Sequence, residues 1–327
     1  MVRTFVTPTL VVSKCIEFDH CRWNGDMITS HIVDRLKGAV NFIPVCPEAD
    51  MGLGVPRDPI RIVGRKEEDN LVQPATGRDV TEDMIRFSES FLDALPPVDG
   101  FILKNKSPSC GVREVKIYAA ANQGGSIGKT TGYFARSVFS RYPGIPAEDE
   151  GRLRNMRIRD HFLTRLYTFS EFREVQAGER MHDLIRFHSE NKLMLMAHNQ
   201  TLEQDMGRIV ANHDKLSPGD VMEQYRVELA RALSRAPRYT ANINVLLHAS
   251  GHFRTKLNHA EKAFFLEALE KYREGRTSIC APKNILKAWI VRFDEKNLDN
   301  QTFFAPYPDE LMELDPLDQD RGRDLWT

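Results

Sequence analysis

The chain lacks several features that would place it in a specialised class of protein. No stretch approaches the roughly 18 apolar residues of a membrane-spanning helix, and the N-terminus lacks the charged-then-apolar pattern of a secretory signal. The formal net charge is −1, so an anionic partner has to be met by a local basic face and not by bulk charge. We therefore expect a cytoplasmic protein without membrane association.

The chain also lacks closely paired cysteines. Its five cysteines are Cys15, Cys21, Cys46, Cys110 and Cys280, and none belongs to a CxxC pair. An odd number without a signal peptide argues against a disulfide framework, and the missing CxxC weakens the zinc-ribbon and thioredoxin interpretations. We expect these thiols to be metal ligands, nucleophiles or buried apolar residues.

Length and periodicity predict two domains, since 327 residues exceed the usual size of roughly 100–200 residues for one domain. Residues 1–150 alternate short apolar runs with helical patterns, which predicts an α/β domain with a mainly parallel sheet in three layers. Residues 166–305 carry apolar positions three and four apart, which predicts an all-α helical bundle. A basic linker helix is expected at 151–165, and residues 306–327, with seven acids and two arginines, form an expected acidic tail.

Individual elements follow from the same patterns. Strands are expected at Leu10–Ser13, Asn41–Val45, Ile60–Val63, Phe101–Leu103 and Val115–Tyr118. Helices are expected at about 26–37, 81–95, 133–142, 181–199, 221–236, 259–274 and 283–293.

A glycine-rich segment from Gly124 to Gly132 invites comparison with a phosphate-binding loop. It has GxxxGKT where such a loop needs GxxxxGKT, because Gln123 stands where the first glycine should be. We expect a flexible glycine loop near the functional site instead.

Three of the cysteines follow predicted strands. Cys15 comes after the first strand, Cys46 directly follows the second, and Cys110 lies in the turn Ser-Pro-Ser-Cys-Gly after the run Phe101–Leu103. If these strands are parallel neighbours, the three thiols share the carboxyl edge of one sheet, where open α/β sheets bind ligands. Such a set suits a zinc site, an iron–sulfur cluster with one iron open to substrate, or a group of buried thiols.

The motifs around these cysteines resemble a known family. SKC, CPE and SPSCG, with CRWNG after the first, are similar to the thiouracil desulfidases, and FHSENKLMLMAHN, INVLLHASGHF and FFAPYPDEL are similar to a helical domain often fused behind them. The whole chain resembles the bacterial tRNA 4-thiouridine desulfidases. The resemblance implies a [4Fe–4S] cluster held by Cys15, Cys46 and Cys110, which binds the thiocarbonyl sulfur at its open iron while water attacks C4. Sulfur would leave without a net change of oxidation state.

Other residues near these cysteines have expected roles beside the cluster. Glu48 is the expected general base, and its alternative role is a loop carboxylate that caps a backbone amide. Ser13, Ser107 and Ser109 are expected to hydrogen-bond the cluster sulfurs, the pyrimidine or the tetrahedral centre, with a structural turn role as the alternative for each. Cys21 is expected to be a nearby thiol that is not a ligand, because a fourth ligand would close the cluster.

Basic residues along the helices are expected to meet the phosphates of tRNA. They are Arg152, Arg154, Arg157, Arg159, Lys192, Arg254, Lys256 and Lys262. A solvated helix face is the alternative for this set. The histidines of the second domain lack the HExxH pattern and are expected to be ordinary helix residues.

Two other functions remain open from the sequence. The first is a desulfidase of free thiouracil or thionucleotides, and the second is a non-catalytic, cluster-bearing RNA-binding or sensor protein. The oligomeric state, monomer or homodimer, is also open.

Overall fold

A computed structural model describes residues 3–65, 68–122 and 124–312. Within these ranges the chain divides into two compact units. The sheet unit holds residues 6–170 and 310–312, and the helical unit holds residues 3–5 and 171–309. None of the described helices combines the length and the apolar character needed to cross a bilayer.

A four-stranded parallel sheet forms the centre of the sheet unit, in the order β2-β1-β6-β9. The strands are β1 (Thr9–Ser13), β2 (Asn41–Val45), β6 (Gly100–Leu103) and β9 (Ala147–Asp149). Every residue of β6 is buried, as expected for a parallel strand covered on both faces. Gly100 leaves no room for a side chain, because a Cβ there would lie 2.9 Å from both a Leu10 methyl group and the Pro146 carbonyl oxygen.

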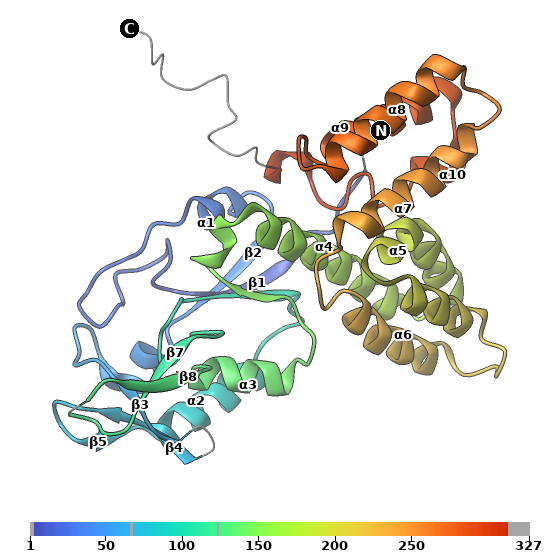
Figure 1. Cartoon of the computed structure of the whole chain (residues 1–327). Coiled ribbons are helices and arrows are strands. Elements are labelled where there is room, and N and C mark those ends of the chain that lie inside the picture. The colour runs from blue at the N-terminus through green and yellow to red at the C-terminus, as the bar shows by residue number, and fades with distance from the viewer. Residues whose placement is uncertain (1–2, 66–67, 123, 313–327) are drawn as a thin grey trace, which may run out of the picture. The chain divides into compact units, whose positions relative to one another are not determined.

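A second, five-stranded sheet has the order β5-β4-β3-β7-β8. Its strands are β3 (Arg61–Arg65), β4 (Glu68–Gln73), β5 (Arg78–Asp79), β7 (Val115–Tyr118) and β8 (Ser126–Thr130). β3 and β7 pair in parallel, and the other neighbours are antiparallel. Figure 1 shows these strands grouped beside α2 and α3. The sequence predicted β3 and β7 but not β4, β5 or β8, because these strands are short or largely solvent-exposed and lack a clear apolar alternation.

Much of the glycine-rich segment is a strand and not a flexible loop, so this part of the expectation is wrong, whereas its position near the cysteine-bearing turn agrees with it. Residues Ser126–Thr130 form strand β8, which pairs antiparallel with β7, and this pairing orders the segment. A Cβ at Gly128 would approach an Ile117 methyl group to 3.2 Å. Gly132 packs tightly on the cysteine-bearing turn, because a Cβ there would lie 2.4 Å from the carbonyl oxygen of Ser109.

Helices α1 (His31–Leu36), α2 (Thr81–Asp93) and α3 (Tyr133–Arg141) belong to the sheet unit, with the short turns η1 (Ala49–Leu53) and η2 (Arg152–Arg154). The positions of α2 and α3 agree with the predictions. α1 is shorter than predicted because the backbone of Ile28 is engaged elsewhere. Its N–H donates to the carbonyl of Cys15 at 2.8 Å, and its carbonyl accepts from the N–H of Glu17 at 2.9 Å.

The helix α4 (Met156–Gly178) contains most of the segment predicted as a basic linker. Its first half buries Phe162, Leu163 and Leu166. A Cβ at Gly100 would lie 3.1 Å from a Leu166 methyl group, so this part of α4 packs directly on β6. The linker segment is therefore part of the core of the sheet unit.

The helical unit contains α5 (Met181–Ala211), α6 (Pro218–Ala232), α7 (Tyr239–Ser250), η3 (Gly251–Phe253), α8 (His259–Arg273), α9 (Cys280–Phe293) and α10 (Lys296–Asp299). Its core is aromatic: the rings of Phe172, Phe187 and Tyr225 have centroids 5.4–6.0 Å apart. α5 leaves helical geometry at Asn199, where the predicted helix ended. The predicted class, an α/β domain with a mainly parallel sheet followed by an all-α domain, is confirmed.

The expected acidic tail lies mostly outside the described residues, which end at Met312. Its first residues are packed, since Asp309–Leu311 form the turn η4 and both Tyr307 and Leu311 are buried. This part of the tail is buried because it contains the apolar side chains of Tyr307 and Leu311 among its acidic residues.

Candidate metal centre

Three cysteines lie at the carboxyl ends of neighbouring parallel strands. The last residues of β1 and β2, Ser13 and Val45, are in register, and Cys15 and Cys46 follow them. β6 pairs with the other side of β1 and leads into the turn that carries Cys110. The expectation that the three thiols share one edge of one sheet is confirmed. Cys15, Cys46 and Cys110 are only 8%, 7% and 5% exposed.

The turn that carries Cys110 is held by its own side chains and by tight packing. The hydroxyl of Ser107 accepts hydrogen bonds from the backbone N–H groups of Ser109 and Cys110, at 3.2 and 3.1 Å. A Cβ at Gly111 would lie 2.7 Å from the carbonyl oxygen of Ser107, so glycine is required there. Ser107 therefore orders the backbone of the turn that carries Cys110, and its contact with the cluster sulfurs, the pyrimidine or the tetrahedral centre stays a prediction.

Four buried cysteines line one pocket of about 340 Å³: Cys15, Cys21, Cys46 and Cys110. Its wall also holds the polar side chains of Ser13, Glu48, Arg57, Lys104 and Ser107 and the aromatic side chain of Trp23. All of these residues belong to the sheet unit. The fold therefore brings together all the proposed ligands and three of the four predicted catalytic residues.

Hydrogen bonds and burial raise the pKa of three thiols of the pocket, those of Cys21, Cys46 and Cys110. Cys21 bonds to both Cys15 and Cys46, and the bond to Cys15, followed by burial, raises the pKa of Cys21 to about 11. The bond to Cys21 and then burial raise the pKa of Cys46. Burial raises the pKa of Cys110, against the opposing effect of a hydrogen bond with Ser13. Binding of a metal at thiolate ligands would therefore release protons.

Glu48 lies at the start of η1 and is held at both carboxylate oxygens. Oε1 accepts from the hydroxyl of Ser109 at 2.6 Å, and Oε2 accepts from Nε of Arg57 at 2.9 Å. Side-chain donors, and not a backbone amide, therefore hold this carboxylate. Ser109 is fully buried and does not itself line the pocket, but its hydroxyl bonds to Glu48, which does.

Arg57 lines the pocket, and the sequence did not predict it. Its side chain is only 4% exposed. Besides Glu48, it donates from Nη1 to the carbonyls of Cys21 and Gly54, both at 3.0 Å, and its Nη2 lies 3.9 Å from Sγ of Cys46. The sequence around Arg57 contains no motif that marks it. Its partners Glu48 and Cys21 are distant in the sequence and become its neighbours only in the folded chain.

Ser13 joins the ends of the two central strands. Its hydroxyl accepts from the backbone N–H of Lys104 at 2.8 Å and also bonds to the thiol of Cys110. Ser13 is thus placed to hydrogen-bond a sulfur ligand, as predicted for it, although this contact does not test a catalytic role.

The acidic run at residues 148–150 is buried beside the pocket. Glu148 and Asp149 belong to β9, and Glu150 directly follows it. Glu150 forms an ion pair with Nζ of Lys104 and accepts from the backbone N–H of Asn105 at 2.8 Å. The burial of these carboxylates is compensated by nearby cations and amides, which a linear charge pattern does not reveal.

The donor set of the pocket fits an iron–sulfur cluster. Within the described ranges, no three His, Cys, Asp or Glu side chains converge closely enough to hold one metal ion. The thiols of Cys15, Cys46 and Cys110 instead surround a pocket of about 340 Å³. Iron–sulfur clusters are held by thiolates that can come from distant loops, whereas a structural zinc needs four convergent ligands. The residues of this pocket fit a [4Fe–4S] cluster.

The basic residues predicted to meet RNA are divided between the two units. Arg152, Arg154, Arg157 and Arg159 lie in the sheet unit, and Lys192, Arg254, Lys256 and Lys262 lie in the helical unit. Several are engaged within the protein. Nε of Arg152 lies 2.8 Å from Glu148, Arg159 is buried, and Lys256 pairs with Glu295 at 3.0 Å. Arg154, Lys192, Arg254 and Lys262 are exposed.

The chain matches two families. Residues 10–150 match the family described as 2-thiouracil desulfurase, and residues 192–308 match DUF1722, described as a protein of unknown function. The cysteine pocket lies wholly within the first match.

Individual proteins show the same similarity. YbgA, an uncharacterised protein of Escherichia coli (strain K12), is 27% identical over 154 residues, which are 46% of this chain and 91% of that protein. YbbK, an uncharacterised protein of Bacillus subtilis (strain 168), is 33% identical over 109 residues, which are 31% of this chain and 72% of that protein. A solved structure titled "[4Fe-4S]-dependent thiouracil desulfidase TudS" is 28% identical, with a TM-score of 0.37, over 45% of this chain and 94% of that one.

Proposed function

We propose that this chain, which belongs to the 2-thiouracil desulfurase family through residues 10–150, is an iron–sulfur-dependent desulfidase that converts 4-thiouridine in tRNA to uridine. The observation that carries the proposal is the pocket at the carboxyl edge of the parallel sheet. There, buried cysteines from three strand ends meet a carboxylate held in a fixed position.

Cys15, Cys46 and Cys110 would hold the cluster, each from a different strand end. When bound, a [4Fe–4S] cluster with three thiolate ligands supplies an iron with an open position, a soft Lewis acid suited to a thiocarbonyl sulfur. Ser13 hydrogen-bonds one of these thiols and Arg57 approaches another, so the protein is prepared to stabilise negative charge on the sulfur ligands.

Glu48 is the proposed general base. A carboxylate offers about four acceptor positions, and Ser109 and Arg57 occupy two of them, which leaves lone pairs for a water molecule in the pocket. Water would give its oxygen to C4 of the pyrimidine, its protons would pass to Glu48 and the departing sulfur, and the C–S bond would break. Sulfur leaves at the oxidation state it had in the substrate, so no electron donor is needed.

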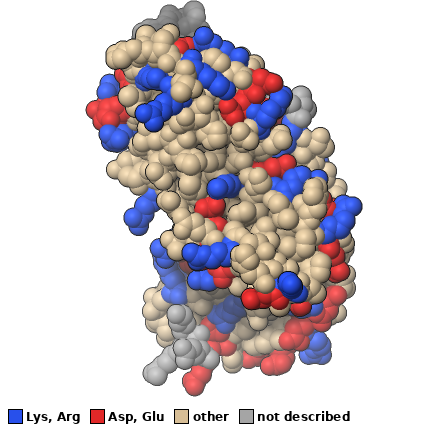
Figure 2. Space-filling model, turned by 90° about the vertical axis from the view of Figure 1, so that its right-hand side faces the viewer, with Lys and Arg blue, Asp and Glu red and all other residues tan. Residues whose placement is uncertain are grey.

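The helical unit is proposed to bind the tRNA. Exposed cations such as Lys192, Arg254 and Lys262 support this role. Figure 2 shows Lys and Arg interspersed with Asp and Glu over the face in view, so phosphate contacts are expected to be few and local. The reacting nucleotide would leave its stack to reach the pocket, as in other enzymes that act on a base.

The direct test uses full-length protein with its cluster reconstituted without oxygen. Thiolated tRNA is added, and the absorbance band of 4-thiouridine is followed. The proposal predicts loss of the band with wild type and no loss with Cys110→Ala. A stable band with cluster-loaded wild type would refute the function.

A second candidate is desulfuration of free thiouracil or a thionucleotide. The pocket favours it, because all of its lining residues among those that the structure describes belong to the sheet unit. Rates on thiolated tRNA and on free 4-thiouracil, measured on the same full chain, separate the candidates. A kcat/KM for tRNA no higher than that for 4-thiouracil would favour the small substrate.

A further inference from the structure

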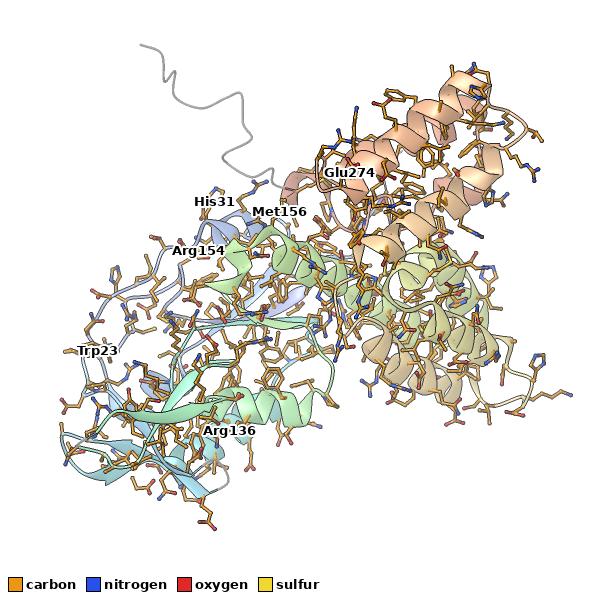
Figure 3. The ribbon with its side chains drawn as sticks, in the orientation of Figure 1. Trp23, His31, Arg136, Arg154, Met156 and Glu274 are labelled. Carbon is orange, nitrogen blue, oxygen red and sulfur yellow. The ribbon has the colours of Figure 1, made fainter. Side chains whose placement is uncertain are left out.

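Cys21 is a buried thiol of the pocket to which the proposed mechanism gives no role. It lines the pocket together with the three proposed cluster ligands. It lies on the loop between β1 and α1, two residues before Trp23, which Figure 3 labels at the left of the view. Ligation by three cysteines leaves this fourth thiol inside the pocket without a part in holding the cluster. Its role has to be inferred from its contacts.

Cys21 contacts Cys46 through both its thiol and its backbone. The two thiols are hydrogen-bonded to each other, and Sγ of Cys46 also lies 3.6 Å from the carbonyl oxygen of Cys21. Arg57 spans the same two residues, since its Nη1 donates to the Cys21 carbonyl at 3.0 Å and its Nη2 lies 3.9 Å from Sγ of Cys46. The backbone N–H of Cys46 donates to Asp50 at 3.0 Å. The fold therefore holds these two sulfurs in contact.

The other two proposed ligands are placed differently. The thiol of Cys110 bonds to the hydroxyl of Ser13. Cys15 shares a hydrogen bond with the thiol of Cys21, but Cys46 meets Cys21 at both the thiol and the carbonyl. Cys46 is thus the ligand most firmly placed against Cys21.

We propose that Cys21 and Cys46 form a reversible disulfide when oxidation removes the cluster, which makes the pair a redox modification site. The oxidant is hydrogen peroxide. It oxidises one thiol to a sulfenic acid and yields one water, and the second thiol then displaces a second water as the S–S bond forms. The two thiols lose two electrons and two protons, and the peroxide takes up both. A dithiol reverses the reaction by thiol–disulfide exchange and is itself oxidised to its disulfide.

The disulfide and the cluster exclude each other, because Cys46 cannot be a thiolate ligand and a disulfide partner at the same time. A thiol that is oxidised as far as a sulfinic or sulfonic acid is lost as a ligand, whereas a disulfide is returned to thiols. The disulfide therefore preserves Cys46 for the next cluster. The inference rests on the cluster site of the proposed function and adds a means of regulating it.

The test starts from the cluster-loaded full chain, which is treated with hydrogen peroxide until its brown absorbance is lost. Unreacted thiols are alkylated with iodoacetamide, and the chain is digested with trypsin without reduction. Trypsin releases Cys21 in residues 15–22, Cys46 in residues 38–57 and Cys110 in residues 107–113. We expect mass spectrometry to find the first two peptides joined, with fragmentation placing the bond between Cys21 and Cys46, and the third peptide in no disulfide.

Cys21→Ser removes the partner of Cys46 and keeps a small polar side chain. After peroxide and then dithiothreitol, Cys46 should be a thiol in the wild type and a sulfinic or sulfonic acid in Cys21→Ser. The variant should then regain less iron than the wild type when the cluster is rebuilt. Cys280→Ser makes the same chemical change in α9, outside the pocket, and should match the wild type in both measurements.

The proposal is overturned if the wild type forms no disulfide, if the bond joins any other pair of cysteines, or if Cys46 is recovered equally well in Cys21→Ser. Disulfide formation requires no substrate, so any of these results leaves the desulfidase function standing. A wild type that forms the disulfide but leaves thiolated tRNA unchanged when loaded with its cluster refutes the function and supports the inference.

Discussion

Arg57→Ala should disable the pocket while leaving every proposed cluster ligand in place. The guanidinium is 4% exposed and its partner Glu48 is 12% exposed, so the two form a buried ion pair. Removing one partner of such a pair costs roughly 3–5 kcal/mol, because the other charge stays buried without compensation. The carbonyls of Cys21 and Gly54 also lose their donor. We expect the free energy of unfolding to fall by about 3–5 kcal/mol.

Arg57→Ala should also lower the rate of turnover. Without Arg57 the carboxylate of Glu48 keeps only its bond from Ser109, so its orientation toward the pocket is lost. A misplaced general base lowers the rate by about 10²-fold or more. Arg57→Lys keeps the charge but lacks the planar fork of donors that reaches both Glu48 and the two carbonyls. We therefore expect an intermediate loss of stability and of turnover.

Urea unfolding followed by circular dichroism measures the stability effect, and iron content shows whether the cluster is retained. A double-mutant cycle with Glu48→Ala isolates the pair, and we expect a coupling of about 0.5–3 kcal/mol. The reasoning is refuted if Arg57→Ala unfolds within about 0.5 kcal/mol of wild type and turns over thiolated tRNA at the wild-type rate.

Three further predictions test other residues. Glu48→Gln should keep the brown cluster and lose about 10²-fold in kcat, and an unchanged rate would remove Glu48 from the mechanism. Cys21→Ala should keep both iron content and activity, and loss of the cluster would make Cys21 a fourth ligand. Burial lowers the pKa of His188 to about 4, so on acidification the unfolded chain binds a proton at this residue before the folded chain does. The free energy of unfolding should therefore fall by about 1–2 kcal/mol between pH 6.5 and pH 5. Thermal unfolding at the two pH values measures this fall, and His188→Gln should remove the part due to His188.

The cysteine edge could be predicted from the sequence because its signals are local. Each thiol follows a short apolar run, and neighbouring parallel strands place their carboxyl ends at one edge. The turn chemistry of SPSCG was also visible in its serines and glycine. The class of both domains followed from periodicity alone.

The rest of the pocket depends on contacts between distant segments. Arg57 bonds to Glu48 and to the carbonyl of Cys21 only after two loops have folded together. Glu150 stands in a run of three acids in the sequence, yet it is buried and paired with Lys104, 46 residues earlier in the chain. Charge compensation is a tertiary property, so a linear pattern of acids cannot distinguish a surface run from a buried one. The helix predicted from residue 26 was too long for a similar reason, since Ile28 pairs with the segment around Cys15.

The central claim is that water replaces the sulfur of 4-thiouridine in tRNA. It is tested most directly by running the reaction in ¹⁸O-labelled water and analysing the nucleosides of the tRNA by mass spectrometry. The account predicts that 4-thiouridine is lost and that uridine carrying ¹⁸O appears in equal amount. An unchanged content of 4-thiouridine, or uridine without the label, would contradict it.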